Sequence, residues 1–349
     1  MNRRVLFLAL GGPEVASSRT RVFQYLPYLP GYGVSATVVV RNPYMLKESR
    51  NRAQRLLRSA FIRARMAGFL ALSMGFRVIV IQKALLPAAF YGFLRFLGKR
   101  IAFDFDDAIY STFDGKGQTD RNLRRLADTR RCAHLVFVEN DVNRAYARRY
   151  CPDVRIITGP IECRRYRPRP RADSGPTTIG WIGSSRSSIY LSLLDAPLRA
   201  LARRFPGAVR VLLVGVTTAP FTGVPVECHP WELDTEVQLL GRFDIGVMPL
   251  FDDEFAQGKG GYKILQYMAM GIPVVASPVG INSELVREGQ EGFLAEDGVA
   301  WEERLGRLVS DPALRARLGA NGRRRATLEY SFERYAGVLA RALQEAGER

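Results

Sequence analysis

A loop of glycine and lysine residues stands directly before an apolar helix. Gly258, Lys259 and Gly260 carry little side-chain bulk apart from one ammonium, so a ligand can approach their backbone closely. The free N–H groups of a helix start attract anions, and Lys263 points back toward them because helical side chains lean toward the N-terminus. Gln266 follows one turn later on the same face. The pattern predicts a diphosphate site with a polar contact beyond it. The alternative is an ordinary joint in an α/β protein, with Lys263 solvated.

A pair of carboxylates follows the apolar strand expected over residues 101–105. Asp106 and Asp107 stand where the carboxyl ends of strands face the ligand crevice in open α/β sheets, which makes them candidate catalytic residues. Two carboxylates also suggest Mg²⁺, but no further ligands complete such a site, so we expect no metal. The alternative is that the two side chains cap the following helix.

Composition disfavours several other chemistries. The chain has only two histidines, too few for a histidine-based metal site or a Ser-His-Asp triad. None of its four cysteines forms a C-x-x-C pair, which argues against a zinc ribbon or a thioredoxin-type site. The histidines are His134 and His229, and the cysteines are Cys132, Cys151, Cys163 and Cys228. We expect free thiols in a reducing compartment.

Two successive sets of short apolar strands and helices are expected to position these residues. The first set has strands near 5–10, 35–40, 78–81, 101–105, 135–138 and 154–158. The second has strands near 178–182, 209–215, 244–248, 273–277 and 292–295, with residues 227–234 as a loop. An Arg/Pro-rich linker separates the sets. The alternation predicts an α/β protein with two doubly wound parallel-sheet domains.

One stretch of the second set resembles the nucleotide-sugar signature of family 4 glycosyltransferases. The matching segments are Leu265–Ala269, Gly271–Ser277 and Val279–Gly280. The family has the GT-B fold, in which two Rossmann-like domains face each other across a cleft. Two departures stand out, because the family's ribose-binding Glu is Gln266 here and its earlier Glu falls on Gly258.

The resemblance implies an enzyme that moves a sugar from a nucleotide-diphosphate donor to a glycan or lipid-linked acceptor, with retention and without cofactor or catalytic metal. By position it implies that Gly12, Gly183 and Ser184 lie at the donor and that Arg186 holds the diphosphate. Asp106 and Asp107 would lie near the reacting sugar. For Arg186, a solvated residue after a serine-rich helix cap is the alternative. The residues proposed to bind the donor are Gly12, Gly183, Ser184, Gly258, Lys259, Gly260 and Gln266.

The resemblance also suggests three regions. Residues 1–168 would form an acceptor domain and residues 169–330 a nucleotide-sugar domain. Residues 331–349 would form a helix that crosses back to the first domain. The pathway expected from this reading is the biosynthesis of cell-surface polysaccharide or glycolipid.

The net charge of +17 predicts an anionic partner without choosing among nucleic acid, anionic lipid and phosphorylated substrate. Residues 45–69 form a basic amphipathic stretch, typical of a helix that lies on an anionic membrane. An ordinary outer helix is the alternative, and nucleic-acid motifs are lacking. No apolar run reaches the length of a transmembrane helix. We expect a cytoplasmic protein with peripheral contact to the inner face of the cell membrane.

Two other functions stay open at this point. The first is another GT-B activity on nucleotide sugars, such as an epimerase. The second is a non-catalytic RNA-binding or scaffold protein, suggested by the high positive charge and by Gln266 in place of the expected Glu.

Overall fold

The computed structural model describes residues 3–43, 51–112, 119–168 and 175–348. The chain folds into two compact units. The first unit contains Met1–Gly159, Gly258–Gly260 and Phe332–Arg349, and the second contains Pro160–Gln257 and Gly261–Ser331. The boundaries expected from the sequence follow residues 168 and 330, and residues 169–174 of the expected linker lie outside the described residues.

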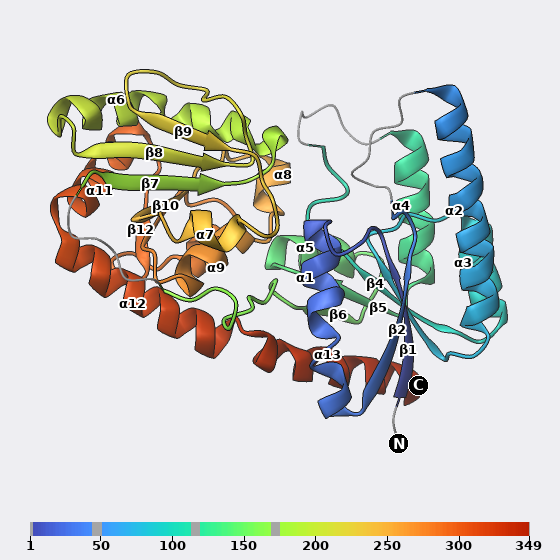
Figure 1. The fold of residues 1–349 in the computed structure, drawn as a ribbon. Coiled ribbons are helices and arrows are strands. Elements are labelled where there is room, and N and C mark those ends of the chain that lie inside the picture. Colours follow the sequence, from blue (N-terminus) through green and yellow to red (C-terminus); the bar gives the residue numbers. More distant parts are fainter. Residues whose placement is uncertain (1–2, 44–50, 113–118, 169–174, 349) are drawn as a thin grey trace. The chain divides into compact units, whose positions relative to one another are not determined.

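The first unit is built on a six-stranded parallel sheet with the strand order β2-β1-β3-β4-β5-β6 (Figure 1). Its strands are β1 (Arg3–Ala9), β2 (Val34–Val40), β3 (Val78–Gln82), β4 (Arg100–Asp104), β5 (Leu135–Val138) and β6 (Val154–Ile156). Most are nearly continuous apolar runs, as expected for a parallel sheet with both faces covered.

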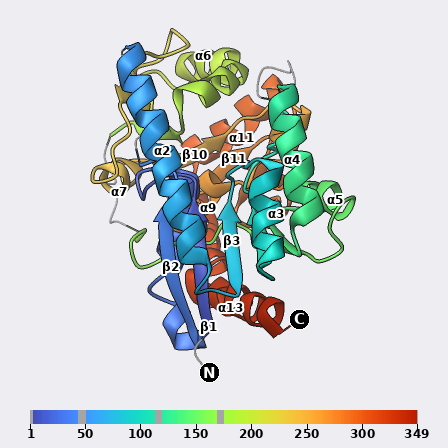
Figure 2. The ribbon, with the colours of Figure 1, turned by 90° about the vertical axis from the view of Figure 1, so that its right-hand side faces the viewer.

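Helices cover both faces of this sheet (Figure 2). They are α1 (Ala16–Arg21), α2 (Arg52–Ser73), α3 (Ala88–Phe96), α4 (Asp120–Cys132), α5 (Asp141–Arg148) and α13 (Phe332–Glu348), with 3-10 turns η1 (Phe23–Tyr25) and η2 (Leu29–Tyr32). Successive strand residues point to opposite faces. Val5 and Phe7 of β1 therefore share a core with α13, whereas Leu6 and Leu8 share a core with α2, α3 and α4. The ring of Phe332, at the start of α13, meets Tyr25 edge-on with centroids 4.9 Å apart.

The second unit has its own six-stranded parallel sheet, with the order β12-β11-β10-β7-β8-β9. Its strands are β7 (Thr177–Ile182), β8 (Val209–Val214), β9 (Val226–His229), β10 (Ile245–Met248), β11 (Val274–Ala276) and β12 (Gly292–Leu294). Its helices are η3 (Ser185–Leu194), α6 (Asp195–Arg204), α7 (Glu236–Leu240), α8 (Glu254–Gln257), α9 (Tyr262–Ala269), α10 (Asn282–Leu285), α11 (Gly298–Ser310) and α12 (Pro312–Glu329). Trp181, Trp301 and Leu198 lie in the core that joins β7 to α6 and α11. No helix among the described residues has the length and apolar character needed to cross a bilayer.

Candidate active site

Lys263 lies on the first turn of α9. Its side chain reaches the end of β7, where that strand leaves the sheet. Its Nζ sits over the Trp181 ring, 4.4 Å from the centroid. A β-carbon added at Gly183 would lie 2.4 Å from the Trp181 ring and 2.6 Å from this Nζ, so glycine lets both side chains rest against the turn. The helix carrying Lys263 starts after Gly261, which has φ 68° and is therefore suited to glycine. An ammonium thus lies beside a half-buried glycine turn, which suits an anion.

Hydrogen bonds fix the direction of α9 relative to the sheet. The Tyr267 hydroxyl accepts from the backbone N–H of Ile182, at 3.2 Å, and donates to the carbonyl of Val247, at 3.3 Å. Tyr267 is fully buried, so these bonds hold the helix firmly against β7 and β10. Lys263 is consequently positioned by a rigid element.

The turn after β7 continues into the 3-10 helix η3. Ser184 is exposed at its start and makes no side-chain bond that caps it, and the Ser187 hydroxyl donates to the carbonyl of Ser184 at 2.9 Å. Arg186 is exposed on η3. Of the residues expected in this turn, the structure brings Gly183 to Lys263 and leaves Arg186 on the surface of the same unit.

The loop at 258–260 belongs to the first unit, whereas Lys263 belongs to the second. Asn143 donates through its amide nitrogen to the carbonyl of Gly258 at 2.8 Å, and Asn140 donates to that of Lys259 at 3.0 Å. A β-carbon on Gly260 would lie 1.2 Å from Glu139 Oε2. Asn140 and Asn143 lie at the start of α5, so this end of α5 holds the loop by its backbone.

Asp106 and Asp107 follow β4 and share one partner, Lys83, which the sequence analysis did not single out. The Lys83 Nζ lies 2.5 Å from Asp106 Oδ1 and 2.8 Å from Asp107 Oδ2. Burial alone would lower the pKa of Lys83, but the two carboxylates outweigh it and raise that pKa. Lys83 follows β3, the neighbour of β4, so strand order read together with charge is the signal that could have found it. Its φ of 54° is unusual for lysine, a feature common near functional sites.

A second charged cluster, Arg21 with Asp104 and Glu139, lies buried in the same unit. The Arg21 Nη2 lies 2.6 Å from Asp104 Oδ2, and its Nη1 lies 3.2 Å from Glu139 Oε1. Nη1 also donates to the carbonyl of Ile157. Burial raises the pKa of both Asp104 and Glu139, and Arg21 offsets only part of that effect. No local pattern marks these three residues in the sequence.

The pH dependence of stability is expected to reflect Glu139. Burial raises its pKa well above the ordinary value of 4.5, so the folded chain binds more protons than the unfolded chain between pH 4.5 and the raised pKa. The free energy of unfolding therefore falls as pH rises through that window. We expect Glu139→Gln to reduce this fall, measured by urea unfolding at pH 5 and pH 8. The exposed Glu296→Gln is the control, and identical profiles for Glu139→Gln and wild type would contradict the assignment.

The glycine turn after β1 is held by β3. Gln82 Oε1 accepts from the backbone N–H of Leu10 and from the Ser18 hydroxyl, each at 3.0 Å, and this hydroxyl accepts from the N–H of Gly11 at 3.0 Å. A β-carbon on Gly12 would lie 2.4 Å from Glu14 Oε2. The turn that includes Gly12 is thus fixed at the same edge of the sheet as Lys83 and the two carboxylates.

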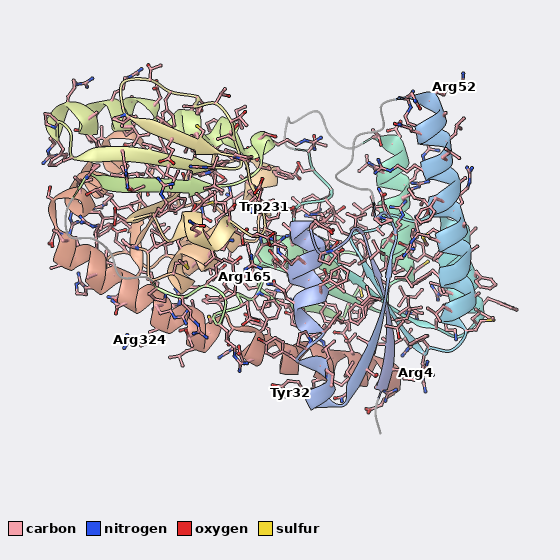
Figure 3. The ribbon with its side chains drawn as sticks, in the orientation of Figure 1. Arg4, Tyr32, Arg52, Arg165, Trp231 and Arg324 are labelled. Carbon is pink, nitrogen blue, oxygen red and sulfur yellow. The ribbon has the colours of Figure 1, made fainter. Side chains whose placement is uncertain are left out.

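Gln266 lies inside the second unit. Only 3% of it is exposed, and its Nε2 donates to the Tyr166 hydroxyl at 3.1 Å. That hydroxyl donates to Glu236 Oε1 at 2.5 Å, and Trp231 Nε1 donates to Glu236 Oε2 at 2.6 Å. Trp231 can be seen in Figure 3. The network gives Gln266 a structural partner that the sequence did not suggest.

In the part of the chain that the structure describes, no group of three or more His, Cys, Asp or Glu side chains is placed to hold a metal ion. The charged groups that remain to be interpreted are the cations beside the glycine turns and at the strand ends.

Residues 176–311 match the family model described as "Glycosyl transferases group 1". Apart from Gly258–Gly260, this group 1 segment belongs to the second unit, and it includes Gly183, Lys263 and Gln266. A curated relative, the D-inositol 3-phosphate glycosyltransferase of Salinispora tropica, is 37% identical over 93 residues, which cover 26% of this chain and 18% of the relative. The match thus spans less than a fifth of that relative's length.

Two solved structures share the fold over almost the whole chain. The sucrose-phosphate synthase of Thermosynechococcus elongatus has a TM-score of 0.72 at 18% identity and covers 99% of this chain and 100% of its own. HepE of Anabaena in complex with UDP-glucose has a TM-score of 0.69 at 14% identity, over 98% of this chain and 99% of its own. The expected fold class is confirmed: the protein is α/β, with two six-stranded parallel sheets and GT-B glycosyltransferases as its structural neighbours.

Proposed function

We propose that this protein is a glycosyltransferase that takes a sugar from a nucleotide-diphosphate donor. The observation that carries the proposal is the Lys263 ammonium beside the Gly183 turn, inside the segment that matches group 1 glycosyltransferases. HepE, which shares the fold, was solved with UDP-glucose, a donor of this kind.

The chemistry follows from charge. When the bond between the sugar and the diphosphate breaks, negative charge grows on the leaving phosphate. Lys263 and the backbone N–H groups that follow Gly183, at the start of η3, are fixed before the reaction, so they stabilise that charge with little reorganisation. The N–H of Gly183 itself donates to the carbonyl of Val214. Arg186 adds a guanidinium on the same unit, suited to phosphate oxygens.

Asp106 and Asp107 are proposed to serve the acceptor. Their shared ion pair with Lys83 offsets much of their negative charge, so we assign them hydrogen bonds to sugar or acceptor hydroxyls rather than strong base chemistry. The proposal includes membership of family 4 and retention of the anomeric configuration, as the resemblance of the α9 region implies. It also includes a glycan or lipid-linked acceptor at the cytoplasmic face of the membrane. The transfer would serve the biosynthesis of cell-surface polysaccharide or glycolipid.

Nucleotide binding tests the donor half of the proposal. UDP or GDP at a hundred times its Kd would stabilise the folded state by about 2.7 kcal/mol through mass action. We expect the melting temperature to rise with one of these nucleotides at millimolar concentration and to stay unchanged with uridine or guanosine, which lack phosphate. An unchanged melting temperature with both nucleotides would count against the proposal.

Product analysis tests the transfer itself. A panel of UDP and GDP sugars is incubated with and without candidate acceptors, and the released nucleotide and the sugar products are measured. Nucleotide release that depends on an acceptor supports transfer. Conversion of the donor sugar without an acceptor would instead identify an epimerase.

A further inference from the structure

The outer face of α3 is apolar although it faces solvent. Tyr91 and Leu94 on its inner side are buried in the core. On the outer side, Phe93 is 41% and Phe96 is 87% exposed, the latter the highest value among the exposed large apolar side chains of the described chain. A surface helix normally carries polar residues on that side. Two exposed phenylalanines there indicate that something other than water covers this face.

The neighbouring helix α2 continues the same surface. Leu56 and Leu57 are 60% and 71% exposed, and Phe61, Leu72 and Met74 are also exposed at its outer side or end. The two helices are packed together, since the rings of Phe69 and Phe90 stack at 5.8 Å and Lys99 Nζ donates to the carbonyl of Met74 at 2.9 Å. Figure 2 shows them side by side. We call the outer faces of α2 and α3 the apolar–arginine surface.

Positive charge accompanies these apolar side chains. Arg52, Arg55 and Arg63 are exposed on α2, and Figure 3 shows Arg52 at its start. Arg65 is more ordered, because its Nε donates to the carbonyl of Val40 at 2.7 Å. Residues 51–99 contain no Asp or Glu, so no acidic side chain of these two helices offsets the arginines. The expected membrane stretch 45–69 is only partly visible here, since residues 45–50 lie outside the described residues.

We propose that the apolar–arginine surface docks on an anionic lipid bilayer. Phe93, Phe96 and Leu57 enter the boundary between headgroups and acyl chains, and the arginines of α2 bind lipid phosphates. A bilayer fits better than an acidic protein, because the apolar side chains project from two adjacent helices rather than lining a groove. The inference rests on the proposed function only for the purpose of docking, which is access to a membrane-bound acceptor. Binding to the bilayer itself needs no catalysis.

Vesicle sedimentation tests the apolar half. The full chain is mixed with vesicles of phosphatidylcholine containing phosphatidylserine. Burying one phenylalanine contributes enough free energy that Phe93→Ser with Phe96→Ser should lower the partition coefficient by about tenfold or more. Val299→Ser is the matched control, since Val299 is exposed in the second unit, and it should bind as wild type does.

Charge reversal tests the other half. Each arginine near an anionic surface contributes about a fivefold factor in binding, so the loss of two in Arg55→Glu with Arg63→Glu should weaken sedimentation by about 25-fold, and repulsion of the new carboxylates should weaken it further. Arg317→Glu with Arg324→Glu makes the same change in net charge on α12 and should keep most of the binding. Sedimentation of wild type with pure phosphatidylcholine should be weak, and 0.5 M salt should reduce binding to the anionic vesicles.

Insertion has a direct readout. All three native tryptophans lie in the second unit, so Phe96→Trp adds a reporter to the apolar–arginine surface. Brominated lipids should quench the added fluorescence of Phe96→Trp, and that of Val299→Trp should stay unquenched. Equal quenching, or equal sedimentation of surface and control variants with unchanged melting temperatures, would overturn the proposal. A dimer detected by light scattering would also overturn the proposal, if Phe93→Ser with Phe96→Ser dissociated that dimer and left vesicle binding unchanged.

Failure of docking is separable from failure of the enzyme assignment. The surface variants should keep the UDP- or GDP-induced rise in melting temperature, because they change neither Lys263 nor the Gly183 turn. A protein that binds nucleotide but not vesicles would leave the glycosyltransferase proposal intact and remove the docking surface. One that binds vesicles but no nucleotide would do the reverse.

Discussion

Lys263→Ala is expected to lower kcat/KM by about a hundredfold, the cost of removing one fixed group that stabilises developing charge. The loss should fall mainly on kcat, because charge on the leaving diphosphate is larger in the transition state than in the bound donor. Lys263→Arg keeps the charge but not its compact shape, so it should recover part of the rate. Initial rates with the donor found in the nucleotide-sugar panel provide the measurement.

The control for this variant is Arg324→Ala on α12, which removes a positive charge from an exposed site outside the proposed machinery. It should leave kcat/KM unchanged. Lys263→Ala should unfold at nearly the wild-type temperature, because its ammonium rests at the edge of the sheet rather than inside a core. Wild-type kinetics in Lys263→Ala would remove this residue from the leaving-group site and with it the main support for the proposed function.

The position of Lys263 shows what local sequence can supply. The glycines before α9 predict where the helix begins, and the lean of helical side chains predicts the direction of Lys263. The structure indeed puts its ammonium beside Gly183. That Gly183 lies at the same site was implied by the resemblance to family 4 glycosyltransferases. The structure pairs β7 with β10, and the segments that follow these two parallel strands lie at the same edge of the sheet.

Other contacts could not be predicted because they join residues with no local signal. Gln266 was expected at a ribose, but its amide meets Tyr166, a hundred residues earlier in the chain. The strand β9 was expected as a loop. It is an edge strand whose residues are half-buried, and the sequence Val-Glu-Cys-His lacks a continuous apolar run.

The charged clusters illustrate the same limit in the first unit. Asp106 and Asp107 were recognised as residues that follow a strand, but their effect depends on Lys83, which follows the adjacent strand. Lys83 could have been found by reading strand order together with charge. Arg21 was hidden more deeply, since it lies on a short helix and its two acidic partners follow or end different strands.

Arg21→Met is expected to destabilise the folded state by about 3–5 kcal/mol, the typical cost of leaving a buried charge without its partner. Methionine fills a similar volume, so the loss comes mainly from Asp104 and Glu139, which would keep only each other as charged neighbours. The free energy of unfolding from urea denaturation at pH 7.5 measures it. Arg317→Met, at an exposed position of α12, is the control and should change that free energy by no more than about 0.5 kcal/mol.

Removing the stranded charges separates an electrostatic cause from a packing cause. Adding Asp104→Asn and Glu139→Gln to Arg21→Met leaves three neutral side chains of nearly unchanged shape, so much of the lost stability should return. Lowering the pH should act in the same direction on the single variant, because protonation of carboxyls whose pKa is already raised by burial removes the charge. If Arg21→Met lost equal stability at pH 5 and pH 7.5, and the triple variant recovered none, the cluster would contribute through packing and not through the pairing of its charges.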